Sequence, residues 1–122
     1  MRNEHTVTQL VVQRRALLES MENDAEFLKA VIGVFLADCP GMLAEIRAAV
    51  AARDATRVMS ASHALKGSVS FFGVQRAVEA ARILESMGKE EELQGANEAL
   101  CVLEREMALV VLALEEIAKE SV

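Results

Sequence analysis

Hydrophobic residues recur every three or four positions along most of the chain, which is the spacing of one face of an α-helix. The breaks in this pattern predict six helical segments, over about 6–20, 24–37, 40–50, 55–72, 74–87 and 93–119. The last segment has the longest apolar stripe, and its members alternate steps of three and four, as in a helix-bundle seam: Leu93, Ala96, Leu100, Leu103, Met107, Val110, Leu114 and Ile117.

Polar, proline and glycine positions predict where these helices begin and end. Asp54 can cap the fourth helix, and Gly73 stands where that helix ends in a left-handed residue. Pro40 suits the first turn of a helix, so we expect the second and third helices to be separate. Gly88 is expected to stop the fifth helix.

Short connections between these helices favour antiparallel neighbours. The expected fold is therefore all-α, with a single domain over residues 1–122. Residues 40–120 are expected to form an antiparallel up-down four-helix bundle. Additional N-terminal helices within residues 6–37 are expected to cover one side or end of it, because the broad apolar girth over 109–114 needs a cover.

Composition excludes several classes of function. The net charge is −6 and the basic residues are scattered, so we expect no nucleic-acid binding. No uninterrupted apolar run approaches the ~20 residues that span a bilayer, so we expect a cytoplasmic protein without membrane insertion. Cys39 and Cys101 lack metal-binding spacing, and His5 and His63 are isolated, so we expect no metal site.

The stretch over residues 62–73 carries the candidate chemistry. Leu65 belongs to the inward stripe of its helix, and His63 lies about 200° around the helix from it, so the imidazole is expected to point outward. Lys66 and Gly67 are one turn from His63 on the same surface, and Ser70 is two turns away. The outward stripe is thus His, Lys, Gly, Ser.

This stripe suits phosphoryl transfer. Neutral imidazole is a nucleophile near pH 7, a lysine one turn away can approach phosphoryl oxygens, and a residue without a side chain at Gly67 leaves the imidazole open on that flank. A lone outward histidine is more often an ordinary surface residue, however, and a nearby lysine is common on any solvated face. Spacing alone leaves both interpretations open.

A longer string of residues resembles a known family. His63-Ala64-Leu65-Lys66-Gly67-Ser68, followed by Phe72-Gly73, resembles the signature of histidine-containing phosphotransfer (HPt) domains. The turn over residues 35–40, and Ala81 with Leu84-Glu85 on the following helix, are also similar to that family. The resemblance spans about residues 24–117.

The resemblance implies roles for individual residues. His63 is the implied phosphoacceptor, Lys66 the residue that stabilises the phosphoryl group, and Gly67 the residue that gives access. Phe71 departs from the family, in which that position is more often polar or small; it is expected either to pack against the neighbouring helix, which we slightly prefer, or to extend a docking patch. The expected access and docking residues are Gly67, Ser68, Ser70 and Phe71.

The resemblance also implies a mechanism and partners. A receiver domain of a response regulator or hybrid sensor kinase docks over His63, which takes its aspartyl phosphate and passes it to a second receiver. The receiver supplies Mg²⁺, and we expect the chain to hold no cofactor of its own and to be a monomer. It has no nucleotide-binding motif, so we expect a phosphoryl carrier without autokinase activity. Two alternatives remain: the phosphoacceptor domain of a chemotaxis-type kinase, and a helical module that only binds proteins.

Overall fold

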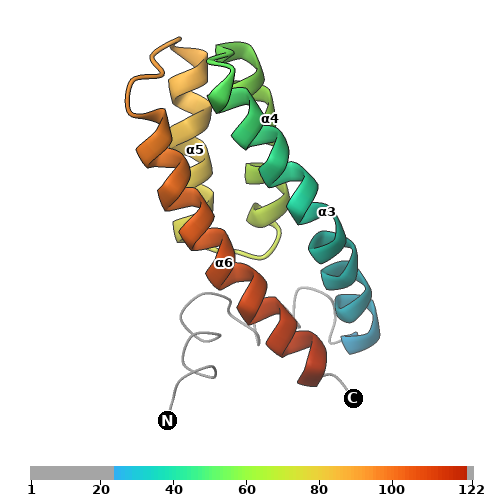
Figure 1. The fold of residues 1–122 in the computed structure, drawn as a ribbon. Helices are drawn as coiled ribbons and strands as arrows, with labels where there is room; N and C mark the ends of the chain where they lie inside the picture. The colour runs from blue at the N-terminus through green and yellow to red at the C-terminus, as the bar shows by residue number, and fades with distance from the viewer. Residues whose placement is uncertain (1–23, 121–122) are drawn as a thin grey trace.

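The computed structural model describes residues 24–120, which form four helices. Their bounds are α3 Ala25–Ala51, α4 Ala55–Ser70, α5 Gln75–Lys89 and α6 Ala96–Glu120. Each helix packs on two others, α3 on α4 and α6, and α5 on α4 and α6, so the four close into an antiparallel bundle (Figure 1). The expected all-α four-helix bundle is confirmed. The helix predicted over residues 6–20 lies outside the described residues.

The predicted break at Pro40 is wrong, because α3 runs through it without interruption. A proline inside a helix costs about 3 kcal/mol, since it removes one hydrogen bond and crowds the preceding turn. Here the apolar stripe continues across the proline, and side chains on both sides of it are buried: Leu28, Ile32, Phe35, Cys39, Ile46 and Val50. Each such side chain contributes about 1.5–3 kcal/mol on burial. The second predicted helix is therefore the first half of α3, and the bundle begins at Ala25 rather than at residue 40.

The predicted cap at Asp54 is confirmed, because its carboxylate accepts from the Arg57 N–H at 3.2 Å. At the start of α3, the Asp24 carboxylate accepts from the Phe27 N–H at 3.0 Å in the same way. Gly73 follows α4 with φ +67°, the left-handed conformation that glycine adopts without strain.

Gly88 has a different role from the one predicted, because α5 continues past it to Lys89. A Cβ at position 88 would lie 2.5 Å from the Met59 nitrogen and 2.6 Å from the Ala55 oxygen. Gly88 therefore permits the backbones of α4 and α5 to approach closely, rather than ending the helix.

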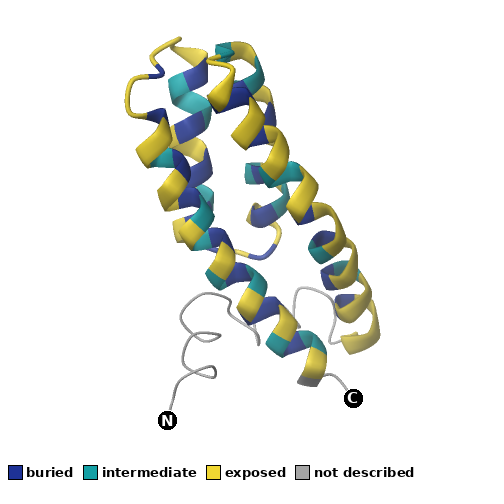
Figure 2. Cartoon of the chain, in the orientation of Figure 1, coloured by how far each residue is buried: buried dark blue, intermediate teal, exposed yellow. Residues whose placement is uncertain are grey.

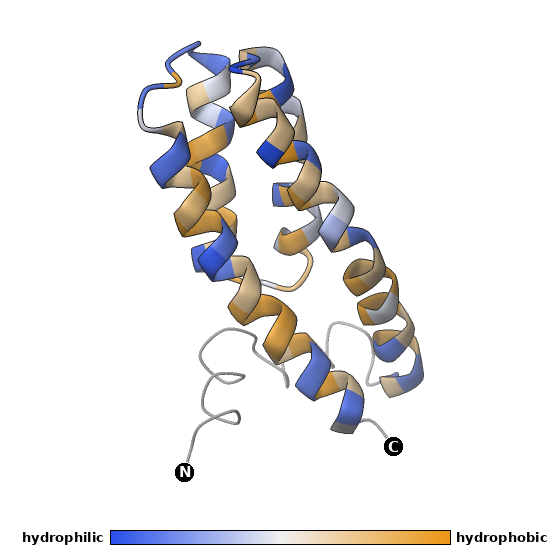
Figure 3. Ribbon diagram, in the orientation of Figure 1, coloured by the Kyte–Doolittle hydropathy of each residue, from blue (hydrophilic) through white to orange (hydrophobic). Residues whose placement is uncertain are grey.

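The core is a continuous, mostly aliphatic seam on the inner sides of all four helices, drawn dark blue in Figure 2. Its largest fully buried members are Ile32, Ile46, Leu65, Leu84, Leu103, Met107 and Leu114. The outer sides carry most of the hydrophilic residues (Figure 3). Helix α3 alone among the described helices is long and apolar enough to cross a membrane by length and composition. Its buried stripe packs against α4 and α6, as in the core helix of a bundle.

Candidate functional site

His63 lies on the outer surface of α4, as its spacing predicts. Its side chain is 67% exposed, while its helix neighbours Ser62 and Leu65 are fully buried. The burial of Leu65 fixes the rotation of the helix, so the imidazole is presented to solvent. The side chain is available to a reactant that approaches from outside the bundle.

A single carboxylate joins the predicted histidine and lysine. Glu85, on α5, places Oε2 at 2.8 Å from the His63 Nδ1 and Oε1 at 2.7 Å from the Lys66 Nζ. The Glu85 side chain is only 19% exposed, whereas Lys66 is 29% exposed. The site is thus a triad of His63, Glu85 and Lys66 across the α4–α5 interface, and the Glu85 carboxylate is its least exposed group.

The sequence names Glu85 within the family resemblance but does not place its carboxylate against His63. The sequence does contain a signal for this contact, which is that His63 and Glu85 are equally far from the turn between α4 and α5. His63 and Glu85 lie eleven residues before and after Val74, so an antiparallel pair that turns at Gly73 brings them level. Predicting the contact also required the rotation of α5, which the burial of Ala81 and Leu84 sets.

The electrostatics of the triad settle which imidazole nitrogen is free. The hydrogen bond from Lys66 is the main cause that lowers the pKa of Glu85, burial opposes it, and the His63 hydrogen bond lowers it further. Glu85 is therefore a carboxylate at neutral pH and accepts a hydrogen bond from the His63 Nδ1–H. In the neutral imidazole the lone pair then resides on Nε2, the nitrogen not engaged by Glu85.

The flank beside His63 is open. A Cβ added at Gly67 would meet nothing within 4 Å, so there is space over the helix at this position. Any larger side chain would extend into that space and lean toward His63, because helical side chains tilt toward the N-terminus.

The two predicted serines turn away from the imidazole. The Ser68 hydroxyl lies 3.8 Å from the Met42 sulfur and faces α3. The Ser70 hydroxyl donates to the Lys66 carbonyl oxygen at 2.7 Å, the local hydrogen bond that serines inside helices often form. The structure brings together His63, Lys66 and Gly67 at one surface, but neither hydroxyl is directed at the imidazole.

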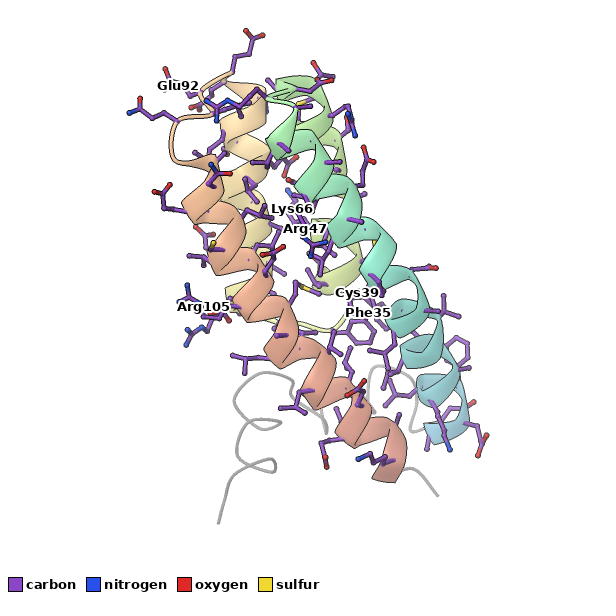
Figure 4. All side chains as sticks on the ribbon, in the orientation of Figure 1. Phe35, Cys39, Arg47, Lys66, Glu92 and Arg105 are labelled. Carbon is purple, nitrogen blue, oxygen red and sulfur yellow. The ribbon has the colours of Figure 1, made fainter. Side chains whose placement is uncertain are left out.

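Phe71 is partly packed and partly exposed, so it fits both roles that the sequence left open, namely packing and extending a docking patch. Its ring packs edge-on against Phe72 at 5.1 Å, yet the residue is 49% exposed. It borders an apolar groove of about 300 Å³ between α3 and the end of α4, lined also by Val34, Phe35 and Met42. Phe35, which lines this groove, is labelled in Figure 4 next to Cys39 on α3, and Lys66 of the triad lies further along the bundle. Phe71 therefore packs on one face and contributes apolar surface on the other.

Clusters of His, Cys, Asp or Glu that could hold a metal ion are absent from residues 24–120. The sequence pattern of the Hpt domain family matches residues 30–118, which include the whole triad. The chain belongs to the Hpt domain family. Hpt domains are phosphoryl carriers rather than catalytic enzymes, and this one is a histidine phosphotransfer module of a two-component phosphorelay.

A solved structure supports the same assignment. The crystal structure of histidine-containing phosphotransfer protein B (HptB) from Pseudomonas aeruginosa PAO1 matches this Hpt domain with a TM-score of 0.80 and 26% sequence identity. The match covers 86% of this chain and 91% of that one. A comparison with curated proteins finds no match. Hpt domains as a family act with receiver domains, which makes receivers the class of partner to consider.

Proposed function

We propose that Nε2 of His63 accepts a phosphoryl group from the aspartyl phosphate of one receiver domain and passes it to the aspartate of another. The observation that carries this proposal is the Glu85 carboxylate at 2.8 Å from Nδ1. It holds the ring in one orientation and one tautomer, so the lone pair of the exposed imidazole lies on the nitrogen that a docking domain can reach.

The transfer is an in-line displacement at phosphorus. The Nε2 lone pair forms the N–P bond while the P–O bond to the receiver aspartate breaks, and the electron pair of that bond leaves with the carboxylate. The imidazole keeps its Nδ1 proton and acquires positive charge. Glu85 stabilises that charge directly, and the reverse step regenerates the neutral ring when the phosphoryl group moves to the second receiver.

Lys66 stabilises the negative charge on the oxygens of the transferred phosphoryl group. Its ammonium lies 2.7 Å from Glu85 at rest and sits one turn from His63 on a flexible side chain, so it can pivot toward the phosphoryl oxygens. The described residues contain no metal cluster, and the Mg²⁺ bound in the receiver supplies further charge neutralisation. On this proposal the chain works as a cytoplasmic monomer without a cofactor of its own.

The docking face is proposed to extend along α4 from His63 over Gly67 to Phe71. The open space at Gly67 admits the receiver backbone, and the exposed part of Phe71 offers apolar area. Interfaces of this kind combine an apolar anchor with surrounding polar groups.

The test is phosphoryl transfer from a panel of phosphorylated receiver domains to the full chain. We expect acid-labile, alkali-stable label in the wild type, no label in His63→Gln, and unchanged label in His5→Gln, which removes the other histidine of the chain. Label that survives in His63→Gln contradicts the assignment. Label that comes only from a kinase catalytic domain and ATP assigns the chain to the chemotaxis-type alternative, and the absence of label from all competent donors assigns it to binding alone.

A further inference from the structure

Ser62 is the one buried polar side chain in the part of the chain that the structure describes, and its hydroxyl has no hydrogen-bond partner there. It lies on α4, directly before His63. Serines inside helices often donate to the carbonyl oxygen four residues earlier, as Ser70 of the same helix does to Lys66 at 2.7 Å. The Ser62 hydroxyl does not. A buried hydroxyl without a partner destabilises the fold, so its presence beside the site requires an explanation.

The register of the α4–α5 pair places Ser62 opposite Glu85. A Cβ at Gly88 of α5 would lie 2.5 Å from the Met59 nitrogen of α4, so these two positions face each other. Ser62 follows Met59 by three residues, and Glu85 precedes Gly88 by three. Because the two helices are antiparallel, both steps move in the same direction along the interface, by about 4.5 Å. Ser62 and Glu85 therefore lie level with each other, and the serine is the more deeply buried of the two.

The Glu85 carboxylate can accept from a third donor. Its two oxygens offer about four lone-pair sites. The structure fills two of them, one with Nδ1 of His63 at 2.8 Å and one with Nζ of Lys66 at 2.7 Å. Ser62 precedes Lys66 by one turn on the same side of α4. A serine hydroxyl changes its direction by rotating about χ1 between staggered positions, with no movement of the backbone. The hydroxyl and the ammonium thus approach one carboxylate from successive turns of one helix.

The proposed transfer frees one of the two occupied sites on the carboxylate. When Lys66 pivots to the phosphoryl oxygens, a side chain that is only 19% exposed loses a donor that water has little access to replace. We propose that the Ser62 hydroxyl then donates to Glu85 and so keeps the carboxylate on Nδ1 of His63. Ser62 is on this account a positioning residue, which acts while the ring carries positive charge and has no partner at rest. The inference rests on the proposed function for the movement of Lys66.

A stability cycle tests this exchange of donors with no phosphoryl donor present. Lys66→Met nearly keeps the length of the side chain and removes its charge, so it reproduces a Glu85 that Lys66 has left. In the wild-type background Ser62→Ala removes an unpartnered hydroxyl, and we expect the thermal midpoint to rise slightly. In the Lys66→Met background the hydroxyl donates to Glu85. There Ser62→Ala is expected to lower the midpoint by about 4 °C, the effect of one hydrogen bond in a domain of this size.

Two controls show whether the reversal of sign depends on the carboxylate. Ser60→Ala removes an exposed hydroxyl from the same helix and should shift the midpoint equally in both backgrounds. When Lys66→Met is combined with Glu85→Ala, the acceptor is gone, and the decrease caused by Ser62→Ala should disappear. A serine with a merely structural role would not distinguish these backgrounds. The same slight rise from Ser62→Ala with and without Lys66 overturns the proposal.

Phosphoryl transfer gives the functional readout. With a phosphorylated receiver as donor, Ser62→Ala is expected to slow acceptance by His63 about fivefold, and to have no further effect in Glu85→Ala. The tautomer of the resting imidazole should not change, because Lys66 still holds Glu85 in that state. A wild-type rate in Ser62→Ala overturns the role of Ser62 and leaves the proposed function intact. Wild-type chain that takes no label from any receiver refutes the proposed function, and the role of Ser62 in transfer falls with it.

Discussion

Replacing Glu85 with glutamine isolates the charge of the bridging carboxylate. Glutamine has nearly the same shape, and its amide oxygen can still accept from His63 Nδ1–H, but it carries no charge to stabilise the phosphorylated ring. Hydrogen bonds to charged groups contribute about 1.5–3 kcal/mol when sheltered. Because the His63 side chain is 67% exposed, solvent reduces this to about 1 kcal/mol. That energy corresponds to a transfer rate about fivefold lower.

Two variants separate charge from orientation. Glu85→Gln is expected to slow transfer about fivefold while Nδ1–H remains the main tautomer, because the amide oxygen replaces the carboxylate as acceptor. Glu85→Ala removes the acceptor as well, so it is expected to slow transfer further and to increase the Nε2–H tautomer. Nitrogen-15 NMR of the imidazole reports the tautomer, and rapid-quench transfer from one phosphorylated receiver reports the rate.

The matched control is Glu79→Gln on the same helix. Glu79 pairs with Arg82 at 2.7 Å on the surface, so its loss removes an ion pair and a negative charge without touching the imidazole. The transfer rate of Glu79→Gln should equal that of the wild type. An unchanged rate and tautomer in Glu85→Ala would refute the argument that Glu85 orients the nucleophile.

Four further measurements check other parts of the structure. Gly67→Leu should raise the thermal midpoint slightly, through helix propensity, yet slow transfer at least tenfold in the same quench assay, because the side chain fills the open flank. Gly88→Ala should lower the free energy of unfolding by about 2 kcal/mol in urea titrations, because its Cβ would clash with the α4 backbone. The pKa of Glu85 is lowered from 4.5, so the ionised carboxylate stabilises the folded protein above pH 4.5, and this contribution is lost as the pH falls through the lowered pKa. In Glu85→Gln, the thermal midpoint should therefore change less steeply with pH on the acid side. Iodoacetamide should modify exposed Cys101 well before Cys39, because burial raises the pKa of the Cys39 thiol.

The sequence predicts the outward face of α4 well, because that prediction depends only on helical periodicity and on which residues are apolar. Leu65 is buried and His63 is exposed, as the spacing requires. The capping residues Asp54 and Gly73 are also correct, since caps act over three or four residues of local chain. Features that depend on local geometry alone can be inferred from one sequence.

Features that depend on packing between helices could not be inferred in this way. At Pro40 a local preference to begin a helix is outweighed by the burial of side chains before and after it. The Ser68 and Ser70 hydroxyls have acceptors nearer than the imidazole, and spacing does not reveal which acceptor a hydroxyl chooses. The contact between Glu85 and His63 depends on both the register and the rotation of α5 against α4.

Gly88 links this packing to the site. It lies three residues beyond Glu85 on α5, where an added Cβ would lie within 2.6 Å of the Met59 nitrogen and the Ala55 oxygen of α4. That close approach sets the separation of the two helices within one turn of the carboxylate, and therefore the 2.8 Å distance from Glu85 to His63. A Cβ at position 88 must push the helices apart, which would lengthen the hydrogen bond to an exposed imidazole before it disrupts the core. We therefore expect Gly88→Ala to increase the Nε2–H tautomer of His63 even in the fraction of molecules that stays folded.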